Sequence, residues 1–102
     1  MPYNTAHLDA KGYNLMVVLE TSEGRILLAT DAENAPVTTR NFLAYIDSGF
    51  YNGLIFHRVI SNFMIQTGGF GPDMEPRKPG EPIPNEADNG LSNRRGTIAM
   101  AR

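Results

Sequence analysis

The sequence predicts a small, mostly β fold with one helix, and three observations support this prediction. Short runs rich in β-branched and aromatic residues recur along the chain, as in residues 55–60. Turn-forming residues such as Ser61-Asn62 separate these runs. Residues 36–48 alone carry a good apolar stripe at helical spacing. The chain has 102 residues, of which 41% are apolar, so it suits one small domain with a core.

Composition and charge exclude several classes of function. The formal net charge of −2 gives no electrostatic reason to expect binding to nucleic acid or to an anionic membrane. The chain has no cysteine, which excludes disulfides, thiolate metal sites and a cysteine nucleophile. The first residues lack the apolar core of a signal peptide, and no run approaches the roughly 20 residues of a membrane span. We therefore expect a soluble, cytoplasmic protein that holds no metal or cofactor.

The first part of the chain predicts a tail followed by a hairpin. Residues 1–14 are polar and are expected to form a tail, in which His7 is a bystander. Residues 15–19 form a continuous apolar run, which suits a strand buried on both faces. Residues 25–29 suit a second strand. The four residues 21–24 between them predict a turn, so the two strands should pair antiparallel.

Residues 36–48 predict the helix. Pro36 fits the first helical position, where no amide donor is needed, and Gly49 suits a left-handed end. Asp31 and Glu33 precede the helix, where negative charge favours its dipole. We expect the helix to cover one open end of a sheet with an apolar stripe, which consists of Val37, Phe42, Leu43, Tyr45 and Ile46.

Residues 55–60 and 63–65 predict a second hairpin, with Ser61-Asn62 at its turn. Strict alternation along the first strand places Arg58 on one face between Phe56 and Ile60. A guanidinium would then lie between two apolar neighbours. The other face carries Ile55, His57 and Val59.

Residues 70–95 predict a long ordered loop, because proline at this density rules out a helix or a central strand. Five prolines fall within 13 residues, namely Pro72, Pro76, Pro79, Pro82 and Pro84. Asn89-Gly90 predicts one turn within the loop, and Arg94-Arg95 is read as a solvated pair. Residues 96–101 are expected to form a last short strand.

The stretch from Phe56 to Gly68 reads F-H-R-V-I-S-N-F-M-I-Q-T-G. It resembles the signature of the cyclophilin-type peptidyl-prolyl isomerases, roughly F-H-R-V/I-I-x-x-F-M-I/C-Q-x-G, at every defining position. The resemblance is specific because Arg, Phe, Met and Gln recur at fixed spacing among matching apolar residues. It extends from about residue 15 to residue 102, and the short loops and the ending G-T-I-A-M-A-R favour the bacterial branch.

The resemblance implies a cyclophilin-like antiparallel β-barrel with capping helices, which in the family has eight strands and two helices. This chain offers at most five or six strand candidates and one helix. We therefore expect an incomplete barrel: a polar tail over residues 1–14, then the N-terminal part of a cyclophilin-like domain over residues 15–102, with the C-terminal part absent. The chain is then a fragment, or another chain supplies the missing half.

The resemblance also implies an activity, the cis-trans isomerisation of X-Pro peptide bonds, which assists protein folding. The family assigns to Arg58 the donor aimed at the prolyl nitrogen. Phe63 and Met64 match the residues that form the pocket for the prolyl ring. Gln66 matches the polar group that holds the substrate backbone or Arg58.

The same resemblance assigns Ala101 and Arg102 to the segment whose backbone pairs with the peptide. The implied partners are proline-containing peptides and unfolded protein chains, with cyclic-peptide inhibitors as further candidate ligands. His57 is read as structural, with a hydrogen bond to the backbone, and not as a general base. Two other functions stay open: a module that binds proline-containing segments without turnover, and an inactive fragment that lacks the C-terminal half of the site.

Overall fold

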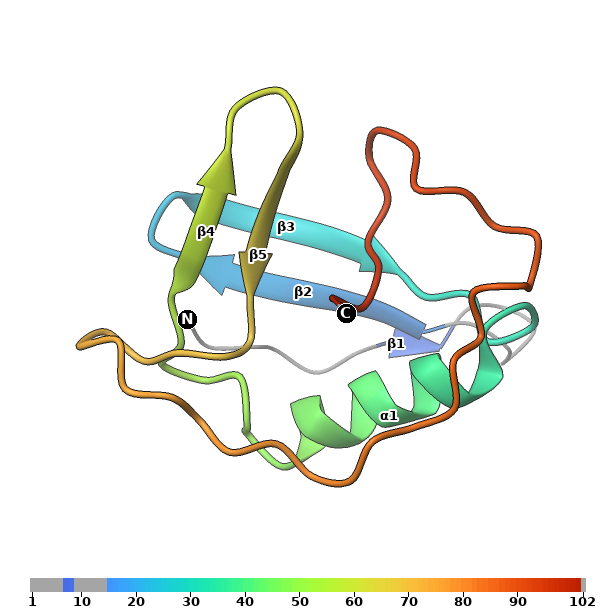
Figure 1. Ribbon diagram of the computed structural model, residues 1–102, viewed down its shortest axis with the longest axis horizontal. Coiled ribbons are helices and arrows are strands. Elements are labelled where there is room, and N and C mark those ends of the chain that lie inside the picture. Colours follow the sequence, from blue (N-terminus) through green and yellow to red (C-terminus); the bar gives the residue numbers. More distant parts are fainter. Residues whose placement is uncertain (1–6, 9–14, 102) are drawn as a thin grey trace.

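The computed structural model describes residues 7–8 and 15–101 (Figure 1). The described part contains the strands β1 (His7–Leu8), β2 (Leu15–Thr21), β3 (Gly24–Ala29), β4 (Phe56–Ile60) and β5 (Met64–Thr67), and the helix α1 (Pro36–Asp47). One antiparallel sheet has the order β1-β2-β3, and β4 and β5 form a second sheet. Over the described residues the fold is therefore mostly β with one helix, and the two sheets do not close into a barrel.

The β2–β3 hairpin is tighter than the sequence predicts. Thr21 pairs with Gly24, so only Ser22 and Glu23 connect the strands, and the expected four-residue connection is wrong. The Thr21 hydroxyl stabilises this turn by donating to the Gly24 carbonyl at 2.6 Å and accepting from the Glu23 amide at 3.1 Å. Gly24 has a φ of +121°, a conformation that residues with a side chain rarely adopt.

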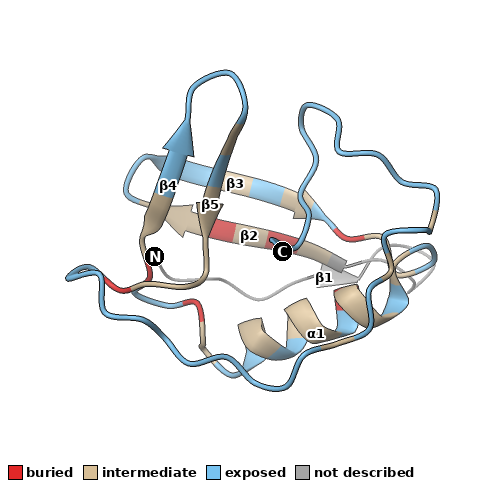
Figure 2. Ribbon diagram, in the orientation of Figure 1, coloured by how far each residue is buried: buried red, intermediate tan, exposed pale blue. Residues whose placement is uncertain are grey.

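The core lies on one face of β2 rather than on both. Val17 and Leu19 are buried, whereas Met16 and Val18, which alternate with them, are only half-buried. Figure 2 shows the buried positions on β2 and in the segment that follows the helix. The burial therefore alternates along β2, and the expectation of a strand buried on both faces is wrong. The second face of β2 is only partly covered by the described residues.

An aromatic cluster joins the helix to the segment that follows it. Tyr51 is buried and its ring centroid lies 5.4–5.7 Å from the rings of its neighbours, which are Phe42, Tyr45 and Phe50. Leu54 is buried as well. Tilted and edge-on ring pairs at these distances are favourable beyond the apolar area that they bury. The cluster fixes where the chain leaves α1 and enters β4.

Helix α1 forms within one residue of its predicted bounds, with Pro36 at its start. Ser48 ends it, and Gly49 follows at a φ of +77°, as expected for a left-handed end. The carboxylate that reaches its first amides comes from Glu86, at 2.7 and 3.1 Å, and not from the residues just before the helix. The Asp31 carboxylate is instead hydrogen-bonded to Asn34.

Residues 70–95 form an irregular connection without helix or strand, as the prolines predict, apart from one bridge between Phe70 and Pro76. The strand expected over residues 96–101 is not formed. A strand requires a neighbour that accepts its backbone hydrogen bonds. No strand among residues 7–8 and 15–101 pairs with this segment, and its Ile98 and Met100 side chains are exposed.

The beginning of the chain is described only at β1. Here His7 pairs with Met16 and Leu8 pairs with Leu15 in antiparallel register, which differs from the tail expected for these two residues. The rest of the predicted tail, residues 1–6 and 9–14, lies outside the described residues.

Candidate functional site

The β4–β5 hairpin carries four of the predicted site residues. Its turn contains Asn62 at a φ of +61°, a conformation that asparagine tolerates better than most residues. The Phe63 amide donates to the Ile60 carbonyl at 3.1 Å and closes the turn. The signature therefore folds locally, since both strands and the turn lie within the same short stretch of sequence.

A β-bulge interrupts the hairpin at His57. Phe56 pairs with Thr67, yet Arg58 pairs with Gln66, so β4 has one extra residue at this point. A bulge reverses the alternation of side chains beyond it. The prediction that Phe56 shares a face with Arg58 is wrong for this reason. Phe56 instead borders a cavity of about 250 Å³ together with Ile26, Val59, Ile65 and the β2–β3 turn.

Beyond the bulge, one face of the hairpin gathers three predicted site residues. Arg58 lies directly opposite Gln66, and Ile60 lies directly opposite Met64. Side chains that are paired across antiparallel strands point to the same side, with Cβ atoms roughly 4.5–5.5 Å apart. The structure thus brings a guanidinium, a carboxamide and a thioether onto one surface, which we call the Arg58 face.

The Arg58 face is open. Arg58 is exposed, whereas Met64 and Gln66 are half-buried. Within the described part of the chain, the Arg58 guanidinium has no hydrogen bond and no ion pair, so its five donors remain available to a ligand. Phe63, at the end of the turn, is 75% exposed. Its ring is therefore not packed into a pocket wall by the residues that surround it here.

His57 packs away from solvent at the bulge. Its ring lies edge-on to Phe70, with 4.7 Å between ring centroids. Its Nδ1 atom is buried and has no hydrogen-bond partner among the residues described. The expected hydrogen bond from His57 to the backbone is thus not found at this nitrogen. The packing on Phe70 supports a structural role for the ring.

Thr67 contributes to the hairpin in a way that the sequence analysis did not identify. Its hydroxyl donates to the Ile55 carbonyl at 2.7 Å, and the Ile55 amide donates to the Phe70 carbonyl at 3.0 Å. These bonds hold both ends of the hairpin together at its base. The sequence signal for this contact is the threonine that occupies the variable position of the signature, between Gln66 and Gly68.

The hairpin lies within a stretch of sequence that matches a known protein family. Residues 16–102 match the family described as "Cyclophilin type peptidyl-prolyl cis-trans isomerase/CLD". The chain belongs to the cyclophilin-type peptidyl-prolyl cis-trans isomerase family. The match covers the whole β4–β5 hairpin, and therefore every residue of the Arg58 face.

Several bacterial proteins resemble this cyclophilin chain over most of its length. Peptidyl-prolyl cis-trans isomerase A of Dickeya dadantii is 59% identical over 86 residues, which are 84% of this chain and 45% of the relative. The cyp18 isomerase of Streptomyces antibioticus is 60% identical, over 84% of this chain and 52% of its own length. Isomerase B of Escherichia coli is 56% identical, over 85% of this chain and 53% of its own length. The chain thus spans about half the length of these relatives.

Two predicted substrate-binding residues of this cyclophilin chain lie at the end of the sequence. Ala101 is exposed and its backbone is in no strand, and Arg102 lies outside the described residues. Ala101 therefore joins no strand here, and its predicted pairing with a peptide stays a prediction, as does that of Arg102. In the described ranges, no helix is long and apolar enough to cross a membrane.

Proposed function

We propose that the protein to which this chain belongs is a peptidyl-prolyl cis-trans isomerase that rotates X-Pro peptide bonds and assists protein folding. The observation that carries this proposal is the Arg58 face. There the Arg58 guanidinium, which has no hydrogen bond or ion pair among the described residues, lies opposite Gln66. Family membership and the names of the bacterial relatives support the same activity. We also propose that residues 15–102 are the N-terminal part of a cyclophilin-like domain that follows a tail over residues 1–14.

The chemistry requires only that the site stabilise a twisted amide. Resonance in the X-Pro amide gives a barrier to rotation of roughly 18–20 kcal/mol. As the amide twists, the prolyl nitrogen becomes pyramidal and regains its lone pair. A donor held near that nitrogen stabilises the twisted state more than either planar state, which lowers the barrier. The Arg58 guanidinium suits this role because it is permanently charged and rigid.

The neighbours of Arg58 have complementary roles in this proposal. Met64 and Phe63 would contact the prolyl ring, because both are apolar and accessible at the open end of the hairpin. Gln66 would orient the guanidinium or hold the substrate backbone from the position directly opposite. Ala101 and Arg102 would pair through their backbone with the peptide, as an added strand does.

The proposed partners follow from this mechanism. They are proline-containing peptides and unfolded protein chains, with cyclic-peptide inhibitors as further ligands of the same face. The net charge of −2 supports neither nucleic acid nor an anionic membrane as a partner. We also propose a cytoplasmic location. Fractionation of the native cells, followed by immunoblotting of each fraction for the protein, would test it.

A second candidate function is a proline-binding module without turnover. The observation that favours it for the 102 residues alone is the exposure of Phe63, since a ring that is 75% exposed gives a loose pocket wall. A loose wall can hold a prolyl ring without fixing it against the guanidinium. A third candidate is an inactive fragment that neither binds nor isomerises proline-containing peptides.

Two measurements separate these functions. Exchange spectroscopy by NMR on a short X-Pro peptide measures the rate of isomerisation directly. Enzymatic activity predicts faster exchange in the presence of the protein, and an Arg58→Ala variant should lose this acceleration. Chemical-shift changes on the Arg58 face without faster exchange would identify a binding module. Unchanged shifts and unchanged exchange would leave only the inactive fragment.

A further inference from the structure

The proline-rich connection is attached to α1 at three points, and these points follow the helix from its end to its start. The Arg77 guanidinium donates to the Phe50 carbonyl at 3.0 Å, just beyond the end of the helix. The Gly80 amide donates to the Tyr45 hydroxyl at 2.8 Å. Glu86 binds the first turn of the helix. We call residues 77–86 the strap, and Figure 1 shows it running antiparallel to α1.

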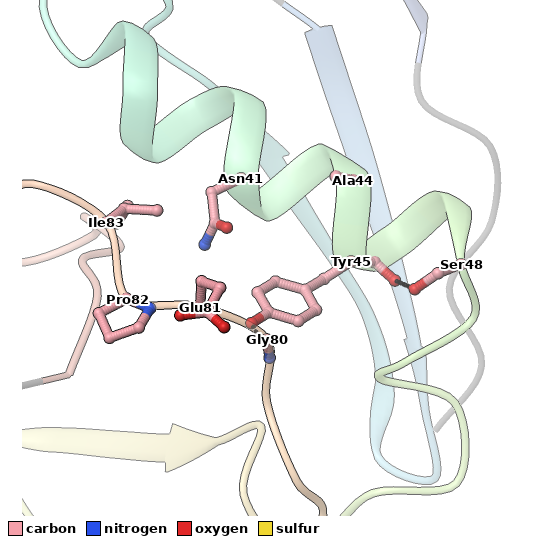
Figure 3. A pocket seen from close by; sticks show the side chains of 8 residues that line it. All are labelled: Asn41, Ala44, Tyr45, Ser48, Gly80, Glu81, Pro82 and Ile83. Carbon is pink, nitrogen blue, oxygen red and sulfur yellow. Dashed lines mark hydrogen bonds between the residues drawn. The ribbon is translucent and has the colours of Figure 1, made fainter.

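The middle of the strap leaves room beside the helix. A cavity of about 420 Å³ lies between the outer face of α1 and residues 80–83 (Figure 3). Tyr45 spans this gap, with its hydroxyl at Gly80. The strap is therefore not packed continuously on the helix, and its position depends on the few polar attachments at its ends and at Tyr45.

The attachment at Glu86 satisfies amides that would otherwise lack an acceptor. The first amides of a helix have no partner within the helix. Residue 35, which precedes α1, is an alanine with no side-chain acceptor. The Glu86 carboxylate accepts the Thr38 amide at 2.7 Å and the Val37 amide at 3.1 Å, from 48 and 49 residues further along the chain. A negative charge at this place also favours the helix dipole.

We propose that Glu86 is an acid-sensitive latch that fixes the end of the strap to the start of α1. Of the three attachments, this one alone depends on a carboxylate. The other two attachments are a guanidinium that donates to a carbonyl and a tyrosine hydroxyl that accepts from an amide. Protonation therefore releases the strap at residue 86 and leaves its attachments at Arg77 and Gly80 in place.

The direction of the pH effect follows from the state of the carboxyl. The hydrogen bond from the Thr38 backbone lowers the pKa of Glu86 below its ordinary value of 4.5, and the Thr38 side chain, the Val37 amide and the field of Arg40 act in the same direction. Partial burial opposes them. A lowered pKa means that the latch stabilises the fold fully above the ordinary value and is lost as the pH falls through the lower folded value.

Other charged residues lie near this end of α1, and they do not replace Glu86. Arg40 is the charged neighbour whose field acts on its carboxylate. In the turn before the helix, Asp31 binds Asn34, and Glu33 is exposed. Asp88 follows in the connection and is exposed.

An NMR titration of the whole 102-residue chain tests the latch. The side-chain carboxyl resonances of its glutamates are followed from pH 7 to pH 2.5 together with the amide resonances of Val37 and Thr38. We expect both amides to shift with the same midpoint as Glu86, at a pH below its ordinary value of 4.5. Unchanged resonances of the Tyr51 cluster over that interval show that the fold persists. Amides that do not follow Glu86 would overturn the proposal.

Two matched variants supply the second measurement. Glu86→Gln keeps the shape of the side chain and removes its charge and one acceptor, whereas Glu81→Gln makes the same change at an exposed position on the strap. We expect hydrogen exchange at Val37 and Thr38 to be about fivefold faster in Glu86→Gln at pH 7, as for the loss of a helix cap. Glu81→Gln should leave exchange unchanged. Equal exchange in the two variants would overturn the latch.

Discussion

Arg58 and Gln66 lie directly opposite each other across the β4–β5 hairpin. Because the pair is formed by neighbouring strands, their separation depends on the register of one short hairpin and not on distant parts of the chain. The bulge at His57 sets this register, since it adds one residue to β4 just before Arg58. The pair therefore forms locally, on a face that the described residues leave open.

Replacement of Arg58 tests its proposed role in catalysis. A chimera in which residues 1–102 are continued by the remaining part of the E. coli relative supplies a protein of the relatives' length. In it, Arg58→Ala should lower kcat/KM for X-Pro isomerisation on the order of a hundredfold, as for the loss of one fixed donor to a transition state.

Arg58→Lys is the matched variant for the same assay. It keeps the charge and loses the planar fork of donors, so it should recover only a small part of the activity. Because Arg58 is exposed, both variants should keep the free energy of unfolding within about 0.5 kcal/mol. Near-normal turnover of the alanine variant would refute the proposed role.

The isolated 102-residue chain should self-associate. Large apolar side chains remain exposed on both sheets, including Leu27, Val59, Phe63 and Ile65, which are 55–75% exposed. Exposed apolar surface and open strand edges favour association between chains. Sedimentation velocity across a dilution series should show oligomers at micromolar concentration, and the chimera should remain monomeric. A monomer that melts cooperatively in calorimetry would contradict this prediction.

Two leucines in the first sheet provide a paired test of the core. Leu19 is buried, at 4% exposure, whereas Leu27 is 66% exposed. Leu19→Ala should lower the free energy of unfolding by about 2–4 kcal/mol, because it removes buried methyl groups and leaves a cavity. Leu27→Ala should change it by less than about 0.5 kcal/mol. Urea denaturation of both variants measures the difference, and equal losses would show that the core is elsewhere.

The turn before α1 should respond to pH through Asp31. The hydrogen bond from the Asn34 side chain lowers the pKa of Asp31 below its ordinary value of 3.8, and the Asn34 amide acts in the same direction. The lowered pKa makes this turn most stable above pH 3.8, and the contribution is lost as the pH falls through the folded value. Asn34→Ala should raise the midpoint of Asp31 toward 3.8 in an NMR titration. An Asp31 midpoint that does not move in Asn34→Ala would contradict this prediction.

The sequence by itself determined the features that depend on neighbouring residues. Helix α1 and the two hairpins follow from local spacing, turn residues and proline positions, whereas the grouping of Arg58 with Gln66 and Met64 came from the resemblance to the family signature. The tight Thr21–Gly24 turn and the bulge at His57 were not predicted. An alternating pattern assumes that every strand residue has one partner, so it cannot show where a strand contains an extra residue. The signature identified the family, but it did not predict the hydrogen bonds of Thr67 and Ile55 at the base of the hairpin.

Only the tertiary structure decided which distant groups meet. No pattern of spacing connects Glu86 with Val37, because their contact depends on how the proline-rich connection returns along the helix. The same dependence explains residues 96–101, whose sequence suits a strand although no described strand pairs with it. Local propensity selects a backbone conformation, but a strand also needs hydrogen-bond partners from elsewhere in the fold.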